Sequence, residues 1–444
     1  MHATPSLVLL FLLGAAAQVS GQQVWVQATP ATSPPAFGGS QAMAFDSVRG
    51  KSLLIGNGPT GTKTWEWDGS SWLQAPLAAN PPATLEYSLG FDPARRRVVF
   101  AGAQQTWEWD PVGSSSWIKN PVSSSRGPRA PFLYHSGRGK LMTVWGGNNI
   151  VAETWDGQQW SAILATTQPT GRNYYWAAYD SDRQRLVMFG GVNGIFLFSD
   201  TWEWDGTDWR ARYPAHVPPG RYGHSMVYDP DRKRIVMFGG FNATELDDLW
   251  EWDGNDWQQV TLSPRPSARY LHTAVYDTAR RRMVLFGGFS GFVPVADTWE
   301  YFLEVAPSYS AFGLGCAGSA GTPRLLAAIG SLPRLGASFS VDLTQLRPGM
   351  ATILTLGTSK TLLGQLPLPF DLTMIGMPGC WAYTSMDATF ALTNLSGAAR
   401  WTATIPNVLS LAGQSFYNQA FVADPGVNIL GVVASNAGEG KVGT

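Results

Sequence analysis

The sequence predicts an all-β protein, with a six-bladed β-propeller over residues 22–304 and a β-sandwich over residues 305–444. One observation is the motif TWEWDGTDW at residues 201–209, whose relatives recur along the first two thirds of the chain. Another is the period of the motif, since its second aromatic residue recurs at intervals of 42, 46, 49, 48 and 49 residues. A fixed period of this length is typical of repeated supersecondary units. The six aligned aromatic residues are Trp67, Trp109, Trp155, Trp204, Trp252 and Tyr301.

Each copy of the repeat predicts four antiparallel strands. In one copy, residues 224–228 and 234–238 are β-rich runs joined by a polar turn that contains Asp229 and Pro230. The following DLWEWDGNDWQQV supplies two more runs joined by Asp253-Gly254, and Asp-Gly is a strong signal for a tight hairpin turn. Such a sheet cannot bury both of its faces alone, so the copies must stack, and radial stacking gives a propeller. The tryptophans would then fill the space between blades.

The two ends of the repeat region predict how the ring closes. The sixth copy stops after DTWEYFLEV and lacks the last strand of the other copies. The segment VWVQATPATSPPAFGG near the N-terminus aligns with DWQQVTLSPRPSARY of a complete copy. We therefore expect a strand around residues 24–28 to complete the last blade, which leaves no unpaired edge at the seam.

The N-terminus predicts export. Residues 7–17, LVLLFLLGAAA, are too few to span a bilayer, and the small residues that follow predict a secretory signal over residues 1–21. Because only His2 precedes the apolar run, without Lys or Arg, a retained anchor is the alternative. We expect a secreted, periplasmic or cell-surface protein with no membrane insertion after cleavage. The formal net charge of -1 gives no global field that would attract nucleic acid.

The C-terminal part differs in composition from the repeats. Residues 309–444 contain eleven charged side chains and no histidine, and alternating runs such as ASFSVDL and RWTATIPN predict a β-sandwich. The only cysteines of the chain, Cys316 and Cys380, lie here, and two cysteines in an exported protein most often form a disulfide. A metal pair or a catalytic thiol is the competing interpretation.

Two resemblances extend this picture. With FGG at 189–191, 238–240 and 286–288, the downstream aromatic residue and the closing tryptophan, residues 22–304 resemble the kelch-repeat family. The first three copies depart from it, since IGN and AGA replace FGG and His135 stands where other copies have Asp. The stretches GLGCAGSAGTPRL, PLPFDLTMIGMPGCW and VVASNAGEGKVG look like a C-terminal module of bacterial secreted proteins.

The resemblance also includes an enzymatic branch, the kelch-type copper radical oxidases. These enzymes need tyrosine and histidine ligands and a tyrosine crosslinked to cysteine, but the predicted propeller contains no cysteine. His224 and His272 occupy the same R-Y-x-H position of neighbouring copies, 48 residues apart, so we interpret them as structural rather than metal-binding. We expect no cofactor and no metal.

The glutamates of the motif recur once per blade and therefore sit apart around the ring. Glycosidic acid/base pairs need two carboxyl groups within about 5–10 Å of each other, so the motif glutamates cannot form such a pair. We expect each to pair with an arginine of the D-x-x-R-x-R turn, such as Arg185, Arg234 or Arg282, at the blade interface.

Ligand binding is expected on the propeller loops, because loops on a rigid scaffold carry function. The loops that enter the blades bring arginines with neighbouring tyrosines, which by resemblance to kelch proteins ring one mouth of the channel. Loops after the glycine pair add phenylalanines suited to a sugar or a peptide. The alternative is structural, with arginines bonded to carbonyls of the next blade and phenylalanines tucked under the loops. The candidates are Arg129, Arg172, Arg221, Arg269, Tyr174, Tyr222, Tyr270, Phe196, Phe241 and Phe289.

Together these features predict a monomeric, non-catalytic recognition protein that binds a glycan or protein ligand through its propeller loops. A polysaccharide-active hydrolase or lyase is one alternative, with His135 as the candidate catalytic residue. A structural cell-surface protein is the other.

Overall fold

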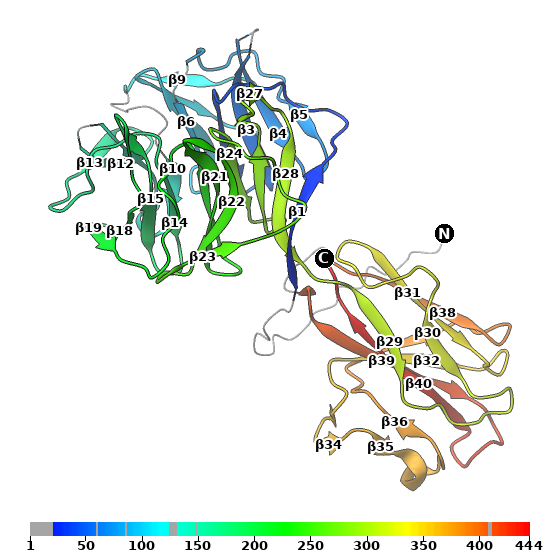
Figure 1. The fold of residues 1–444 in the computed structure, drawn as a ribbon. Helices are drawn as coiled ribbons and strands as arrows, with labels where there is room; N and C mark the ends of the chain where they lie inside the picture. Colours follow the sequence, from blue (N-terminus) through cyan, green and yellow to red (C-terminus); the bar gives the residue numbers. More distant parts are fainter. Residues whose placement is uncertain (1–20, 59–60, 85–86, 124–130, 148, 407–410) are drawn as a thin grey trace. The chain divides into compact units, whose positions relative to one another are not determined.

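The computed structural model describes residues 21–58, 61–84, 87–123, 131–147, 149–406 and 411–444 (Figure 1). Residues 1–20 of the predicted signal peptide and Arg129 lie outside these ranges. The chain forms two compact units, Gln23–Phe302 and Leu303–Thr444, which are described separately. Within the described ranges, no helix has the length and apolar character needed to cross a bilayer.

The first unit consists of six four-stranded antiparallel sheets among the described residues, one for each predicted copy of the repeat. Blades 1 to 3 contain β2 (Gln41–Asp46), β3 (Lys51–Gly58), β4 (Gly61–Trp67) and β5 (Trp72–Gln74); β6 (Tyr87–Asp92), β7 (Arg97–Gly102), β8 (Gln105–Trp109) and β9 (Ile118–Asn120); and β10 (Phe132–His135), β11 (Lys140–Trp145), β12 (Val151–Trp155) and β13 (Trp160–Ile163). Blades 4 to 6 contain β14 (Trp176–Asp180), β15 (Arg185–Phe189), β18 (Thr201–Trp204) and β19 (Trp209–Arg212); β20 (Ser225–Asp229), β21 (Arg234–Asn242), β22 (Thr244–Trp252) and β23 (Trp257–Val260); and β24 (Thr273–Asp277), β25 (Arg282–Phe286), β28 (Thr298–Glu304) and β1 (Gln22–Ala28).

The innermost strands show that the blades close into a ring. β2, β6, β10, β14, β20 and β24 contact one another in this order, and β24 contacts β2 again. The outermost strand of blade 6 is β1, which lies beside β28 as predicted from the two ends of the repeat region. Trp25 of β1 is buried against Phe238 and Tyr301, so the ring is closed by hydrogen bonds and by aromatic packing.

The turn after each innermost strand contains a left-handed residue at the same place in all six blades. In each blade we count from the Asp or His that ends the innermost strand. The fourth residue after it has a positive φ, and these residues are Gly50, Arg96, Gly139, Gln184, Lys233 and Arg281. In most blades an aspartate begins the turn, and its carboxylate accepts backbone N–H groups two and three residues later, as Asp180 does from Asp182 and Arg183. These local hydrogen bonds stabilise the turn. Blade 3 has His135 at this position, followed by the short 3-10 helix η1 (Ser136–Arg138).

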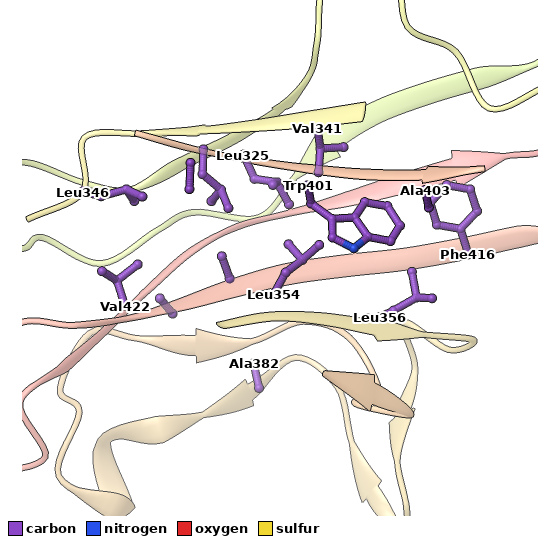
Figure 2. Close-up of a cluster of buried hydrophobic side chains, with 14 of the residues drawn as sticks. Leu325, Val341, Leu346, Leu354, Leu356, Ala382, Trp401, Ala403, Phe416 and Val422 are labelled. Carbon is purple, nitrogen blue, oxygen red and sulfur yellow. The ribbon is translucent and has the colours of Figure 1, made fainter. Parts of the chain in front are cut away.

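The second unit contains two sheets around one core. The five-stranded sheet has the order β29 (Ser308–Phe312), β40 (Val432–Lys441), β39 (Ser415–Ala423), β32 (Thr352–Gly357) and β37 (Ala388–Leu392), and the three-stranded sheet consists of β30 (Arg324–Ala327), β31 (Ser338–Thr344) and β38 (Ala399–Thr404). Figure 2 shows Trp401 and Val341 of the smaller sheet and Leu354 of the larger sheet within the shared core.

The disulfide of this unit joins Cys316 to Cys380, as predicted, and both cysteines belong to the core. Cys380 lies in the segment between β32 and β37, two neighbouring strands of the five-stranded sheet, and this segment carries only short elements. These are the hairpin β33 (Leu362–Leu363) and β34 (Leu366–Pro367), the pair β35 (Phe370–Asp371) and β36 (Trp381–Ala382), and the 3-10 helix η2 (Leu372–Ile375).

Candidate binding surface

A buried arginine stands before the innermost strand of blades 4, 5 and 6. Arg221 is 0% exposed, and its guanidinium donates to both carboxylate oxygens of Asp248 at 2.6 and 2.8 Å and to the Gly239 carbonyl at 3.0 Å. The indole Nε1 of Trp250 donates to the same carboxylate at 2.7 Å. Bidentate arginine–carboxylate pairs of this kind are strong and hold the two side chains in a fixed relative orientation. The same arrangement recurs for Arg172 with Gly190, Asp200 and Trp202, and for Arg269 with Gly287, Asp297 and Trp299.

In each of these pairs the charge of the arginine is neutralised by an aspartate of the same blade. Burial alone would raise the pKa of the Asp248 carboxyl, but the hydrogen bonds and charge of Arg221 outweigh burial and hold that pKa below its usual range. The pKa values of Asp200 and Asp297 are lowered in the same way. The carbonyls that the arginines bind belong to the same blade, not to the next blade as the structural alternative expected. A ligand at this end of the propeller would therefore meet the loops that the arginines hold, while the guanidinium groups stay buried.

The residues after these arginines link the three blades. The second residue after each arginine has a positive φ, 54° at Tyr174, 65° at Gly223 and 54° at Leu271. The Gly223 N–H donates to the Tyr174 carbonyl at 2.9 Å, and the Leu271 N–H donates to the Gly223 carbonyl at 2.7 Å. Tyr222 and Tyr270 occupy the position before this left-handed residue, so Tyr174 is not their structural equivalent. Asn173 is, since it forms the isolated bridge with Val192 that Tyr222 and Tyr270 form with Phe241 and Phe289.

Three small hairpins extend from this end of blades 4 to 6. Blade 4 has β16 (Val192–Asn193) with β17 (Phe196–Leu197), and blade 6 has β26 (Phe289–Ser290) with β27 (Val293–Pro294). In blade 5 the hairpin is the continuation of β21 and β22, which turns at Asn242–Thr244. The Glu245 carboxylate accepts the N–H groups of Gly291 at 2.6 Å and Phe292 at 2.9 Å, which ties the hairpin of blade 6 to blade 5.

Aromatic rings form a continuous cluster across these blades. Tyr222 lies 5.5 Å from Phe241 and 6.4 Å from Tyr270, and Tyr270 stacks on Phe289 at 5.4 Å. Phe241 also lies 6.2 Å from Phe292. Phe241 thus supports Phe292, which is 68% exposed at the tip of the blade 6 hairpin, and Phe196 at the tip of the blade 4 hairpin is 70% exposed. We call this set the hairpin surface, formed by exposed Ile195, Phe196, Phe292 and Val293 and half-buried Tyr222, Phe241, Tyr270 and Phe289.

The predicted site residues thus divide into two groups. Phe196, Phe241, Phe289, Tyr222 and Tyr270 belong to the hairpin surface, and Tyr174 touches its margin through Tyr222 at 6.1 Å. The described arginines lie beneath it. Sequence reasoning missed Ile195, Val293 and the three aspartates, although the D-x-W spacing before each motif, as in Asp248-Leu-Trp250, recurs in blades 4 to 6 and marks the arginine partner.

The two histidines of the R-Y-x-H positions lie inside the ring. His224 and His272 are buried, and burial is the main cause that lowers the pKa of His224 well below its ordinary value and that of His272 to about 3. The position is also occupied by Gln41 in blade 1, whose side chain donates to the Phe286 carbonyl of blade 6 at 3.1 Å. His272 Nε2 lies 2.9 Å from the Ser225 hydroxyl of blade 5. In the described ranges, no group of three or more His, Cys, Asp or Glu side chains is placed to hold a metal ion.

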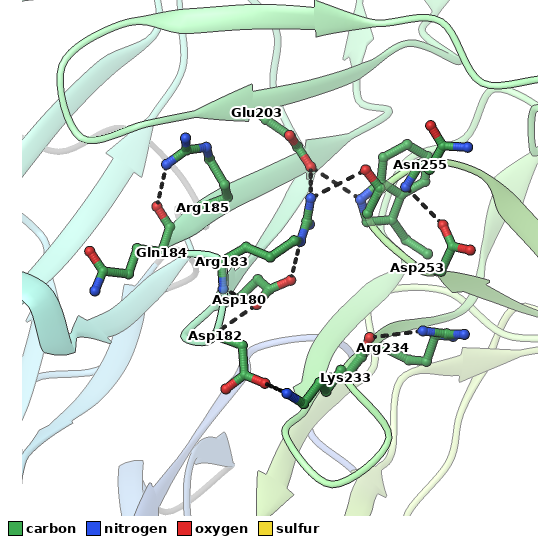
Figure 3. Close-up of polar contacts among 12 residues, drawn as sticks. Asp180, Asp182, Arg183, Gln184, Arg185, Glu203, Lys233, Arg234, Asp253 and Asn255 are labelled. Carbon is green, nitrogen blue, oxygen red and sulfur yellow. Dashed lines mark hydrogen bonds and ion pairs between the residues drawn. The ribbon is translucent and has the colours of Figure 1, made fainter.

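The motif glutamates lie at the seams between blades, paired with arginine. Figure 3 shows the Arg183 side chain between Asp180 and Glu203, with Nη1 2.7 Å from Glu203, while Arg185 turns away to the Gln184 carbonyl. The prediction that Arg185 and Arg234 pair with the glutamates is therefore wrong, and the one for Arg282 is confirmed. The observed pairs are Glu66–Arg49, Glu108–Arg95, Glu203–Arg183, Glu251–Arg232 and Glu300–Arg282.

These glutamates also bind the next blade. Trp252 Nε1 of blade 5 donates to Glu203 of blade 4 at 3.2 Å, and Trp257 Nε1 donates to the Thr201 hydroxyl at 2.9 Å. The tryptophans of the motif therefore fill the seams, as predicted, and also form hydrogen bonds across them. Equivalent links are Trp155–Glu108, Trp160–Thr106, Trp67–Glu300, Trp72–Thr298, Trp117–Thr64 and Tyr301–Glu251.

His135, the candidate for the enzyme alternative, lies at the far end of β10 from the loop that enters blade 3. Its ring is buried, 4.4 Å from the Tyr179 ring and 5.8 Å from the Trp204 ring. Burial and the charge of Arg138 lower the pKa of His135 below its ordinary value. The side chain thus belongs to the seam between blades 3 and 4 rather than to the hairpin surface.

Comparison with known families supports the repeat assignment. Residues 198–310 match the KLHDC2/KLHL20/DRC7 Kelch-repeats domain, so this part of the chain is a kelch-repeat domain. The match covers blade 5, the strands β24, β25 and β28 of blade 6 and the outer strands of blade 4. No curated protein matched the chain.

Proposed function

We propose that this chain is a non-catalytic recognition protein that binds a protein ligand at the hairpin surface. The observation that carries the proposal is the exposure of apolar tips, Ile195 and Phe196 on the hairpin of blade 4 and Phe292 on the hairpin of blade 6, where Phe292 packs on the Phe241 ring of the intervening blade 5. Exposed apolar clusters on a folded surface mark interaction sites, and aromatic residues are enriched among the energetically dominant contacts.

A protein ligand suits this surface better than a glycan. Recognition of a sugar needs exposed hydrogen-bonding groups around an aromatic ring, but the guanidinium groups of Arg172, Arg221 and Arg269 are bonded inside their blades. The Glu245 carboxylate is likewise occupied by backbone N–H groups. What the hairpins offer to solvent is mainly apolar, which favours the apolar patch of a protein partner.

We also propose that the protein acts outside the cytoplasm. The apolar run of residues 7–17 supports export. The Cys316–Cys380 disulfide agrees with it, because disulfides persist mainly in oxidising compartments.

The proposal is tested by site-specific photo-crosslinking in the producing cells. A benzophenone amino acid replaces Phe196 or Phe292, and in the control it replaces Leu164, an apolar residue outside the hairpin surface that is even more exposed. We expect the two hairpin positions to give an adduct with the same protein and the control position to give none. Equal adducts at all three positions, or no adduct at either hairpin position, would contradict the proposal.

A glycan array on the purified protein distinguishes the other ligand class. Saturable binding to one glycan that is lost in a folded Phe196→Ala, Phe292→Ala double variant would reassign the hairpin surface to carbohydrate. We expect no such binding.

A further inference from the structure

The centre of the propeller contains a cavity of about 360 Å³. Its walls are the innermost strands of all six blades, β2, β6, β10, β14, β20 and β24. Several of the lining residues are alanines, among them Ala42 and Ala44 of blade 1, Ala177 and Ala178 of blade 4 and Ala274 of blade 6. This volume lies within the range of about 300–1,000 Å³ that is usual for small-molecule sites.

The chemistry of the walls is uniform. Among the described residues that line the cavity, none is Asp, Glu, Lys or Arg. The imidazole of His272 reaches the wall, and its burial keeps it neutral at pH 7. The aspartates that directly follow the lining aromatic residues, such as Asp180 after Tyr179, turn outward to arginines of the turns. The fold thus keeps its many ion pairs at the seams and leaves the cavity without charge.

We propose that this central cavity is a binding site for an uncharged, largely apolar small molecule. A charged ligand would lose its hydration without finding a counter-ion, and that loss is expensive in an apolar environment. An apolar ligand is stabilised in proportion to the apolar surface that it buries. Hydroxyl groups of Ser136, Ser181 and Thr278, in the turns at one end, provide neutral polar partners for a ligand with a single polar group.

Two dyes of the same ring skeleton test the proposal on the full chain. N-phenyl-1-naphthylamine is neutral, and its 8-sulfonate analogue is anionic. We expect saturable fluorescence enhancement with one equivalent of the neutral dye and at least tenfold weaker binding of the sulfonate. No saturable binding of the neutral dye, or equal binding of both dyes, would overturn the proposal.

Variants locate the bound dye. Ala44→Leu with Ala177→Leu adds bulk from blades 1 and 4, and folding is checked by circular dichroism. We expect affinity for the neutral dye to fall at least tenfold, whereas Phe196→Ala with Phe292→Ala on the hairpin surface should leave it unchanged. A loss confined to the hairpin variant, or unchanged affinity in the folded cavity variant, would place the dye elsewhere. If the cavity variant does not fold, the crystal structure of the wild-type protein with a brominated neutral dye decides by the position of the bromine.

Discussion

The seam between blades 4 and 5 and the seam between blades 3 and 4 solve the same packing problem with different chemistry. At the first seam, Glu203 and Thr201 accept the indole N–H groups of Trp252 and Trp257. At the second seam, the equivalent acceptor positions hold Thr154 and Ala152.

We call the seam between blades 4 and 5 the regular seam and the seam between blades 3 and 4 the irregular seam. At the irregular seam, two buried tryptophans lack a hydrogen-bond acceptor among the described residues. Trp204 and Trp209 are as buried as their counterparts, yet among the described residues their Nε1 groups have no hydrogen-bond partner. Arg138 still reaches across to the Gly206 carbonyl, as Arg183 reaches Gly254 at the regular seam. The six-fold ring persists through both seams. Aromatic packing is therefore enough to set the shape, and the polar links add stability to a geometry that does not depend on them.

Removal of the glutamate should give the largest difference in stability between the two seams. Glu203→Ala should lower the free energy of unfolding of the propeller by about 3 kcal/mol, because it removes one of the two carboxylates bound to Arg183, the carboxylate paired with Arg212 and the acceptor of the Trp252 indole N–H. Thr154→Ala, at the equivalent position, should cost about 1 kcal/mol or less. Chemical denaturation followed by tryptophan fluorescence measures both, since only Trp381 and Trp401 lie outside the propeller. Equal losses would mean that the two seams do not differ.

Acid should weaken both seams, because His224 at the regular seam and His135 at the irregular seam both have lowered pKa values, but the effect should be larger at the regular seam, where the pKa of His224 lies well below its ordinary value. A histidine with a lowered pKa in the folded state binds fewer protons there than in the unfolded chain, so its stabilising effect is complete above about pH 6.5 and declines as the pH falls toward the folded value. For His272 that value is about 3, and the loss by pH 5 should be about 2 kcal/mol. His224, between blades 4 and 5, shifts in the same direction, whereas the seam between blades 3 and 4 has Tyr175 at this position.

The matched variants follow blade 1, which has glutamine at the same position. We expect His224→Gln with His272→Gln to flatten the dependence of the unfolding free energy on pH between 7 and 5. Tyr175→Phe should leave that dependence as it is in the wild-type protein. A wild-type slope in the double glutamine variant would show that other groups cause it.

A smaller difference should appear when the indole N–H groups are removed. Trp257→Phe deletes a donor that is bonded to Thr201, and Trp209→Phe deletes one without a partner. Both lose similar volume, so the first should cost about 1 kcal/mol more than the second, which is the usual net value of one hydrogen bond. Thermal unfolding at neutral pH measures the difference, and identical costs would contradict the role assigned to the seam hydrogen bond.

The smallest expected effect is a gain. Ala152→Thr places a hydroxyl where blades 1, 2 and 4 have Thr64, Thr106 and Thr201, and should raise the free energy of unfolding by about 0.5 kcal/mol. Ala152→Val has the same shape without the hydroxyl and is the control. If valine stabilises as much as threonine, packing rather than hydrogen bonding accounts for the gain.

Much of the architecture could be predicted from the sequence. The period of the WEW element, the N-terminal strand that completes blade 6 and the Cys316–Cys380 bond follow from spacing and from chain context. The arginine partners could not be predicted, because both arginines of the turn fit the pattern. The first, Arg183, pairs with the glutamate in blade 4, whereas the second, Arg282, does so in blade 6. The burial of Arg221 could not be predicted from the sequence either, because its partner Asp248 lies beyond the FGG element in the same blade.

The closure of blade 6 by β1 has a consequence for the growing chain. This strand is among the first parts of the propeller to be synthesised, but its partner β28 is the last, and translation of the residues between them takes on the order of tens of seconds. A polypeptide interrupted before residue 298 would keep β1 unpaired, with Trp25 lacking the Tyr301 ring against which it is buried. The ring can therefore close only after the whole propeller has been synthesised. A truncated product would expose β1, with its Trp25 side chain, to proteases and chaperones.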